Sequence, residues 1–390
     1  MAAKKTIKIP LFDLKVSAAA RREVAEVLNS GWLTTGPKVA AFEKAVGEYL
    51  GVNQAVAVSS GTSGLQLLLT AIGAKPGCEI MTTPFTFVAT IEAILATGAR
   101  PVLADIDPAT LNIDPEEVAR KISSKTLAIL PVDIAGYPAD YPRLNKIADY
   151  HKLPLVTDSA HAIGGRYQNH STPRLADASV FSFYSTKNLT CGEGGMVVSR
   201  HKMVIDAIRS LANHGLTSNA HARKAKGGWQ YDAVRPGFKA NMSDVAAAIG
   251  LGEIKSLDKK QKKRTALAQR YIRNLKQFSR YFELPTVASG FTHGWHLFII
   301  RLHLSELKCD RNKFISLMAL RGIECGVHYQ PVFELSYYQR LLSLSPNYFP
   351  NTTYAGRRVV SLPLYPELTT VQVDQVCEAI EDVLKRYGWK

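Results

Sequence analysis

The sequence has 390 residues, a length that suits an enzyme of two domains better than a single small module. Hydrophobic residues make up 46% of it and charged residues 21%, which excludes a disordered chain, a collagen-like chain and a small disulfide-rich scaffold. The 48 lysines and arginines exceed the 33 aspartates and glutamates. The resulting formal net charge of +15 leaves nucleic acid, membrane surfaces and small anionic substrates as candidate partners.

Signals for membranes, secretion and disulfides are weak. No run of about 18 apolar residues occurs, so no transmembrane helix is predicted, and the N-terminal lysines precede no apolar stretch of signal-peptide length. The five cysteines are scattered and form no CxxC pair, which predicts reduced thiols and no metal site. These features favour a cytoplasmic protein.

Residues 54–199 alternate short apolar runs with helical patterns. Helical spacing covers residues 65–74 and 87–98. The runs rich in Val, Ile and Leu that we predict as strands lie in residues 55–58, 79–84, 100–107, 126–136, 153–160, 179–185 and 194–199. We therefore predict the α/β class, with a mostly parallel central sheet flanked by helices and with ligands at the carboxyl ends of the strands.

The pattern changes after Met242. Residues 243–275 keep helical spacing. A second α+β pattern follows, with strands and helices predicted at residues 296–302, 311–322 and 361–366 and in the C-terminal stretch. We predict a large domain of residues 1–255 and a smaller C-terminal α+β domain of residues 256–390, with the boundary near Ser256.

The stretch Ser59–Gly64, SSGTSG, follows a predicted strand and leads into a helix. Small residues let backbone N–H groups and hydroxyls approach a phosphate, and a helix N-terminus adds favourable partial charge. The alternative is an ordinary helix start capped by Thr62 or Ser63.

Asp158 ends an apolar strand in the stretch LVTDSAH. A carboxylate there can pair with a cationic ring nitrogen, whereas the alternative is an ordinary turn or N-cap aspartate. His161, three residues further on, is either a stacking or hydrogen-bonding residue or a histidine satisfied within a loop.

Lys187 follows a buried strand in the stretch SFYSTKN, before CGEGG. A buried lysine is costly while it is charged, but a lysine with a lowered pKa has a neutral amine that can attack a carbonyl carbon. The alternatives are a lysine that extends to solvent and one that pairs with Glu193.

In this order, the Ser/Thr/Gly loop, Asp158 and Lys187 resemble the site of pyridoxal-phosphate enzymes of the aspartate aminotransferase fold type, fold type I. The whole chain further resembles the DegT/StrS sugar-nucleotide aminotransferases. The stretches that carry this resemblance are SGWLTTGPKV, VSSGTSGLQLLL, TTPFTFVATIEAI, DSAHAIGG, FSFYSTKNLTCGEGG, PGFKANMSDVAAAIGL, WHLFIIRL, RGIECGVHY and SLPLYPELT. DSAHAIG, TCGEGG and WHLFIIRL are most similar to the branches that make UDP-4-amino-4-deoxy-L-arabinose and UDP-4-amino-4,6-dideoxy-sugars.

The resemblance implies roles for individual residues. Lys187 matches the Schiff-base lysine, and Asp158 matches the partner of the pyridine nitrogen. Phe87 matches the aromatic ring stacked on the cofactor, and His161 the residue near its phenolic oxygen. The remaining matches are Gly61, Thr62, Ser63 and Ser182 for the cofactor phosphate, Asn241 of a neighbouring subunit for the same phosphate, and Tyr184, His328 and Tyr329 for the sugar nucleotide.

The resemblance also implies a function. Pyridoxal 5′-phosphate (PLP), with pyridoxamine 5′-phosphate as its intermediate form, would carry an amino group from glutamate to C4 of a UDP-linked 4-keto pentose or 4-keto 6-deoxyhexose. This chemistry belongs to amino-sugar synthesis, as for lipopolysaccharide. The implied partners are these small molecules and a second copy of the chain, in a homodimer with shared active sites, but neither nucleic acid nor a membrane.

Two alternatives stay open: a 3-keto dTDP-sugar aminotransferase of the same family, and a PLP sugar enzyme that does not transaminate. Relatives that remove C–O bonds replace the lysine with histidine, whereas this chain has Lys187. The chain departs from the family at Asp133, where many relatives have His, and at Tyr184, where the arabinose branch tends to have His. The segment 220–228 is unusually basic, and KKQKKR (259–264) is predicted to be a solvated helix face.

Overall fold

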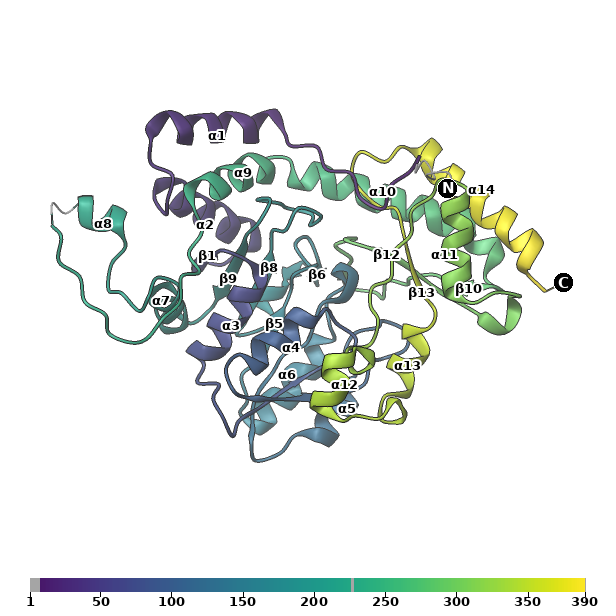
Figure 1. The fold of residues 1–390 in the computed structure, drawn as a ribbon, viewed down its shortest axis with the longest axis horizontal. Coiled ribbons are helices and arrows are strands. Elements are labelled where there is room, and N and C mark those ends of the chain that lie inside the picture. Colours follow the sequence, from purple (N-terminus) through teal and green to yellow (C-terminus); the bar gives the residue numbers. More distant parts are fainter. Residues whose placement is uncertain (1–7, 226–227, 390) are drawn as a thin grey trace.

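The computed structural model describes residues 8–225 and 228–389, which form a central sheet between helices and a smaller antiparallel sheet beside it (Figure 1). The strands of the central sheet, in spatial order, are β3 (Arg100–Leu103), β2 (Glu79–Thr82), β4 (Thr126–Ile129), β5 (Val156–Asp158), β8 (Ala178–Ser182), β9 (Gly195–Ser199) and β1 (Ala55–Val58). The parallel bridges Ile129↔Leu155 and Val132↔Asp158 connect β4 to β5. Among these described strands β9 alone runs antiparallel to both neighbours, so the prediction of a mostly parallel sheet is confirmed.

Helices cover both faces of the sheet because its strands are apolar on both sides. Along β1, Val56 and Val58 face one layer, whereas Ala55 and Ala57 face the other. The helices of the first layer are α3 (Gly61–Ala71), α4 (Val88–Leu95) and α7 (Lys202–Leu211). Those of the second layer are α2 (Pro37–Leu50), α5 (Pro115–Lys121) and α6 (Tyr141–His151).

Helix α9 (Asp244–Ile254) packs closely against α1 (Ala18–Ser30) and α2. A Cβ atom at Gly252 would lie 2.2 Å from the backbone of Ala20 in α1, and one at Gly250 would lie 2.5 Å from the Phe42 ring in α2. The small residues of α9 are therefore used for packing within the chain.

The C-terminal part has its own core. Its antiparallel strands are β10 (Phe282–Glu283), β12 (Phe298–Leu302) and β13 (Val359–Leu362). Its helices are α10 (Leu257–Leu275), α11 (Arg311–Leu320), α12 (Ser336–Leu342), α13 (Pro350–Gly356) and α14 (Thr370–Tyr387). The N-terminal segment joins this core, because Ile9 is buried in it and bridges Ile323. The domain boundary near Ser256 stays a prediction.

The predicted helical stretch 243–275 is two helices, because Ser256 leaves the helical conformation with φ −111° and ψ 4°. In the basic run that follows, Lys259, Lys262 and Lys263 are exposed, but Arg264 is buried and donates to the carbonyls of Trp295 and Leu364. Arg264 thus belongs to the core and not to a solvated face.

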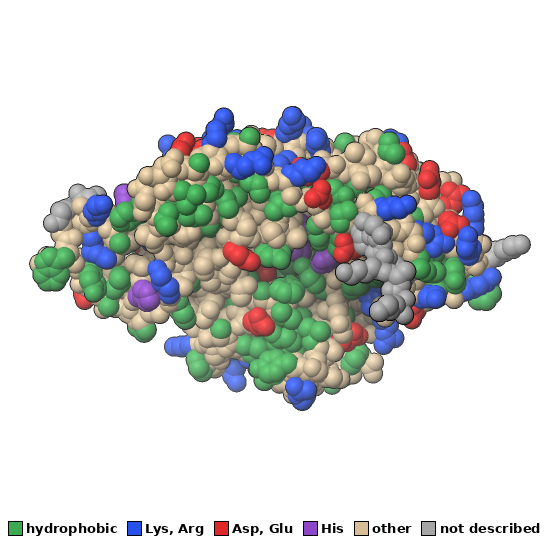
Figure 2. Space-filling view, turned by 45° about the horizontal axis from the view of Figure 1, so that its top comes forward, with side chains coloured by type: hydrophobic (Ala, Val, Ile, Leu, Met, Phe, Trp, Pro, Cys, Tyr) green, Lys and Arg blue, Asp and Glu red, His purple; other side chains and the backbone are tan. Residues whose placement is uncertain are grey.

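The surface and the thiols add three observations. Figure 2 shows lysine and arginine side chains spread over several parts of the visible face. No helix in the described part of the chain is long and apolar enough to cross a membrane. All five cysteines are free thiols.

Candidate active site

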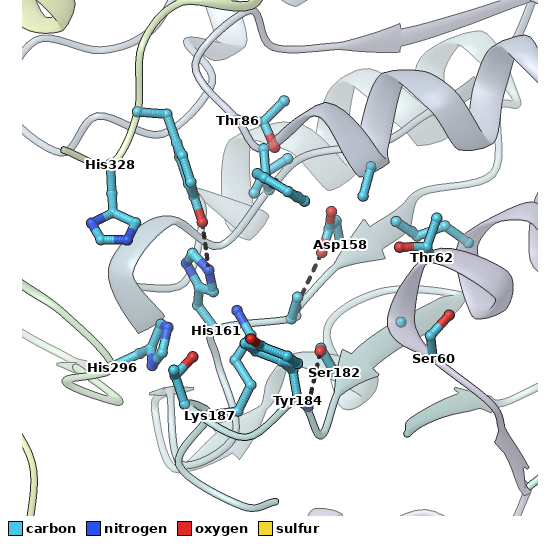
Figure 3. Close-up of a pocket in the computed structure, with 18 of the residues that line it drawn as sticks. Ser60, Thr62, Thr86, Asp158, His161, Ser182, Tyr184, Lys187, His296 and His328 are labelled. Atoms are coloured by element: carbon cyan, nitrogen blue, oxygen red, sulfur yellow. Dashed lines mark hydrogen bonds between the residues drawn. The ribbon is translucent and has the colours of Figure 1, made fainter. Parts of the chain in front are cut away.

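A cavity of about 420 Å³ lies where β1, β5 and β8 end, and the C-terminal part of the chain closes one side of it (Figure 3). Ten of the twelve predicted site residues line this cavity, and the other two, Ser63 and Asn241, do not. Those that line it are Gly61, Thr62, Phe87, Asp158, His161, Ser182, Tyr184, Lys187, His328 and Tyr329.

Lys187 reaches the cavity from the loop after β8, where its backbone N–H donates to the carbonyl of Tyr184 (2.9 Å). Burial lowers the pKa of its amine to about 8, and the nearby Asp158 charge opposes this shift. Within the described residues the amine has no ion-pair partner, and Glu193 lines the same cavity without pairing with it. At pH 7 about one tenth of the Lys187 amine is therefore neutral, far more than for a lysine with the ordinary pKa of 10.5.

Asp158 ends β5 and is buried. Its Oδ2 accepts from the Thr90 hydroxyl (2.8 Å) and its Oδ1 from the backbone N–H of Ala160 (3.1 Å), while Thr86 bonds Thr90 in turn (2.8 Å). Burial raises the pKa of Asp158, whereas these hydrogen bonds and Lys187 oppose the rise. Asp158 thus presents a fixed carboxylate to the cavity.

The start of α3 and Ser182 form the opposite end of the cavity. The backbone N–H groups of Gly61 and Thr62 have no partner among the described residues, and the Ser182 hydroxyl lies beside them. Any side chain at position 61 would crowd Ser182, because its Cβ would lie 3.0 Å from the Ser182 Cβ. Free N–H groups at a helix N-terminus beside a hydroxyl suit a phosphate.

Neither of the two residues predicted as alternative caps is the N-cap of α3. The N-cap is Ser60, whose hydroxyl accepts from the Ser63 N–H (3.1 Å), while the Ser63 hydroxyl accepts from the Ser60 N–H (3.0 Å). This capping box turns Ser63 away from the cavity, whereas Ser60 lines it.

Phe87 and His161 flank the space between these two ends. The Phe87 side chain is 55% exposed, unusual for an aromatic ring in a cavity, and therefore offers a free face for stacking. The His161 Nε2 forms a hydrogen bond with the Tyr329 hydroxyl (3.0 Å), and its Nδ1 has no partner in the described structure. Burial, together with Lys187 and His328, lowers the pKa of His161 well below its usual value, so the ring is neutral.

Phe12 and His296 also line the cavity, although neither was predicted as a site residue. Phe12, from the N-terminal segment, stacks on His296 with ring centroids 6.1 Å apart, and the ring centroids of His296 and His161 are 4.4 Å apart. His328 bonds the Ser361 hydroxyl (2.8 Å) and faces the same space. The motif WHLFIIRL contains His296, but only packing reveals its place.

Asn241 lies outside this cavity. It bridges Val58 at the end of β1, donates to the Thr35 hydroxyl (2.5 Å) and accepts from Lys239 (2.7 Å). It lines a second, surface cavity of about 660 Å³ together with Thr35 and Arg235.

The chemistry of the cavity fits PLP: a carboxylate at one end, a lysine amine of lowered pKa, an exposed ring for stacking and an anion-binding helix start. The fold and the site thus define a fold type I PLP enzyme. Residues 15–381 match the model of the DegT/DnrJ/EryC1/StrS aminotransferase family, and the chain belongs to that family.

Individual relatives agree. The chain is 39% identical to the spore coat polysaccharide biosynthesis protein SpsC of Bacillus subtilis, over 93% of this chain and 94% of that protein. The putative sugar aminotransferase Spr1654 of Streptococcus pneumoniae, in its PMP form, superposes with a TM-score of 0.91 and 30% identity, covering 97% of this chain and 100% of that one. Its PLP form is also similar.

Helicobacter pylori PseC, an aminotransferase involved in the biosynthesis of pseudoaminic acid, superposes with a TM-score of 0.90 and 29% identity, over 97% of this chain and 99% of that one. The neighbours in PLP and PMP forms agree with the donor set of the cavity, and PLP is the cofactor of this family.

Proposed function

We propose that the protein transfers the amino group of glutamate to C4 of a keto-sugar nucleotide, a UDP-linked 4-keto pentose or 4-keto 6-deoxyhexose. The observation that carries the proposal is the joint projection of Lys187 and Asp158 into one cavity, opposite the anion-binding start of α3. Similarity to the sugar aminotransferases supports the class of acceptor.

When bound, PLP supplies a carbonyl carbon that takes up and gives back an amino group, and a ring that draws electrons from it. Gly61 and Thr62 bind its phosphate through their N–H groups, and Ser182 through its hydroxyl. Phe87 would stack on the ring, and His161 would lie near the ring oxygen. Asp158 holds a proton on the ring nitrogen by a charge-assisted hydrogen bond.

Lys187 acts as the acid and base. Its neutral Nζ would take the proton from the α-carbon of glutamate and give it to the cofactor carbon that takes up the amino group. The same transfers in reverse order would serve the sugar. Because one cavity serves both substrates in turn, we expect ping-pong kinetics. Tyr184, His328 and Tyr329 border the space left for the sugar nucleotide.

We further propose a homodimer with shared active sites. Asn241 lies outside its own chain's cavity and lines the surface cavity together with Val234 and Arg235. In the segment that leads to Val234, Trp229 and Tyr231 are 80% and 60% exposed. A second subunit would cover these aromatic side chains and bring Asn241 to the cofactor phosphate of the neighbour.

The test is a coupled assay of the purified, PLP-loaded protein with glutamate and matched 3-keto and 4-keto sugars on UDP and dTDP. We expect 2-oxoglutarate to form fastest with a UDP-linked 4-keto sugar, and not at all with Lys187→Ala. Preference for a 3-keto dTDP-sugar would overturn the proposed substrate but leave the proposed aminotransferase activity intact. Absence of transfer to every acceptor, with PLP bound, would overturn the function.

A further inference from the structure

Asp133 is a fully buried carboxylate to which the roles above assign no task. It follows β4, in a segment that runs beside the end of β5. Its backbone N–H donates to the carbonyl of Asp158 (3.0 Å), and the N–H of Asp158 donates to the carbonyl of Pro131 (3.0 Å). The backbones of Asp133 and Asp158 are therefore fixed against each other.

The two side chains lie on opposite faces of the sheet. Val132 and Asp158 line the cavity, whereas the Asp133 side chain does not line it and contacts Tyr141 of α6, in the second helix layer. There its Oδ2 accepts from the Ser159 hydroxyl (2.6 Å), and its Oδ1 accepts from the Tyr141 hydroxyl (2.8 Å) and the Ala139 N–H (2.9 Å).

Ser159 extends this contact into the strand that carries Asp158. Its hydroxyl also bonds Thr157 (2.6 Å) and Thr172 (3.1 Å), and these residues are all buried. The residues before and after Asp158 are thus both held from the face opposite the cavity. A buried network of this kind has one arrangement in which all its members are satisfied.

The charge of Asp133 has no cation beside it. No ion pair within residues 8–225 and 228–389 includes Asp133. The titratable groups that act on it are Tyr141 of α6, by a hydrogen bond, and Asp158 of β5, by its charge from the other face. Burial raises the pKa of Asp133 to about 6, and its hydrogen bonds oppose the rise, so it is largely ionised at pH 7 and above. In such surroundings its field is weakly screened.

We propose that Asp133 is a positioning residue for the reaction: it fixes the end of β5 through Ser159, and its negative charge favours the proton on the cofactor ring nitrogen beside Asp158. The inference rests on the proposed function, because it takes the role of Asp158 as given. Two carboxylates, one on each face of the sheet, then act on one nitrogen.

The test uses Asp133→Asn, which keeps the size and removes the charge. The readout is the nitrogen-15 chemical shift of PLP labelled at its ring nitrogen and bound to the enzyme, followed against pH. We expect the midpoint of ring protonation to fall by about one pH unit, and kcat to fall about tenfold with the KM for glutamate little changed. Tyr141→Phe, which removes one hydrogen bond but keeps the carboxyl group, is the matched control and should lower the midpoint less than Asp133→Asn does.

If Asp133→Asn fails to fold, Asp133→His takes its place in the test, since many relatives carry histidine at this position. This variant should lower the midpoint as well. An unchanged midpoint in the folded Asp133 variant, alongside a lowered midpoint in Asp158→Asn, would overturn the inference and leave the proposed function intact. An unchanged midpoint in Asp158→Asn would instead refute the proposed role of Asp158.

Discussion

Lys187 and Asp158 lie in one cavity, and the charge of each favours the charged form of the other. Burial disfavours the charge on each group, whereas their mutual attraction favours both charges. For Lys187 burial dominates, and its pKa falls to about 8 from an ordinary 10.5. An amine with this pKa is ready to accept a proton near neutral pH, which the proposed acid–base role requires.

The first prediction concerns the titration of Lys187 in the cofactor-free protein. Only a neutral amine is acylated, so the rate of acetic anhydride labelling at Lys187, followed by mass spectrometry, should rise with pH through a midpoint near 8. Because the Asp158 charge raises the pKa of Lys187, Asp158→Asn should move this midpoint to lower pH. A midpoint near 10.5 in the wild type would contradict the burial of the amine.

The second prediction concerns Asp158 in the loaded enzyme. Asp158→Asn keeps the hydrogen bond from Thr90 possible but removes the charge, so it should cost about 3–4 kcal/mol of transition-state stabilisation, measured from kcat/KM. Thr90→Val keeps the carboxylate charge and should cost less. If Asp158→Asn reacts within a few-fold of the wild type, Asp158 is a structural turn residue.

Lys187 and Asp158 each lie in a short motif that follows or ends a strand, where the sheet brings loops together. That is why Lys187 and Asp158 were predictable before any coordinates. Phe12 and His296 were not, because their contact depends on how the N-terminal segment packs on the C-terminal core. The sequence did not reveal that Ser63 points away from the cavity, because this follows from a capping box that begins at Ser60, one residue before Gly61.

At the scale of elements, helix α2 depends on a cap from another helix. Its own N-cap, Gly36, has no side chain, and Asp244 at the start of α9 accepts instead from the N–H groups of Gly36 (2.8 Å), Lys38 (3.2 Å) and Val39 (3.0 Å). Asp244 is buried, so these donors cannot turn to water.

The third prediction follows from this cap. Asp244→Ala should lower the free energy of unfolding by about 2–3 kcal/mol, because it leaves buried N–H groups without an acceptor. Asp244→Asn, which keeps one acceptor oxygen, should lose less. Urea denaturation measures both, and a loss within about 0.5 kcal/mol in the alanine variant would show that water replaces the carboxylate.

Apolar runs and helical periodicity located most strands and helices, but they did not predict the direction of each strand or where one helix ends and the next begins. The antiparallel direction of β9 follows from its short connection to β8 through the loop that carries Lys187, and composition does not encode it. The break at Ser256 was hidden for a similar reason, since residues on both sides of it keep helical spacing. Tertiary contacts decide such features.

At the scale of the whole molecule, one cavity joins segments from most of the chain length. Phe12, the start of α3, β5, the Lys187 loop and residues 328–329 all meet there. Asn241 faces away from it, and its side chain bonds Thr35 on the surface of the second cavity. A role for Asn241 in catalysis therefore requires a second copy of the chain.

The last prediction tests that requirement with a hybrid dimer. Lys187→Ala and Asn241→Asp chains carrying different tags are co-expressed, and the mixed species is isolated; Asn241→Asp places a negative charge against the cofactor phosphate. If Asn241 acts across the interface, one of the two sites in the hybrid keeps both residues intact. The hybrid should then regain about half of the wild-type activity, although each parent variant is nearly inactive.

The opposite outcome is equally clear. If Asn241 served its own chain's cavity, one site of the hybrid would lack Lys187 and the other would carry the altered Asn241, so no activity would return. Sedimentation equilibrium of the wild type provides the second measurement. A fully active monomer would remove the shared site altogether, because no neighbour would then be present to bring Asn241 to the phosphate.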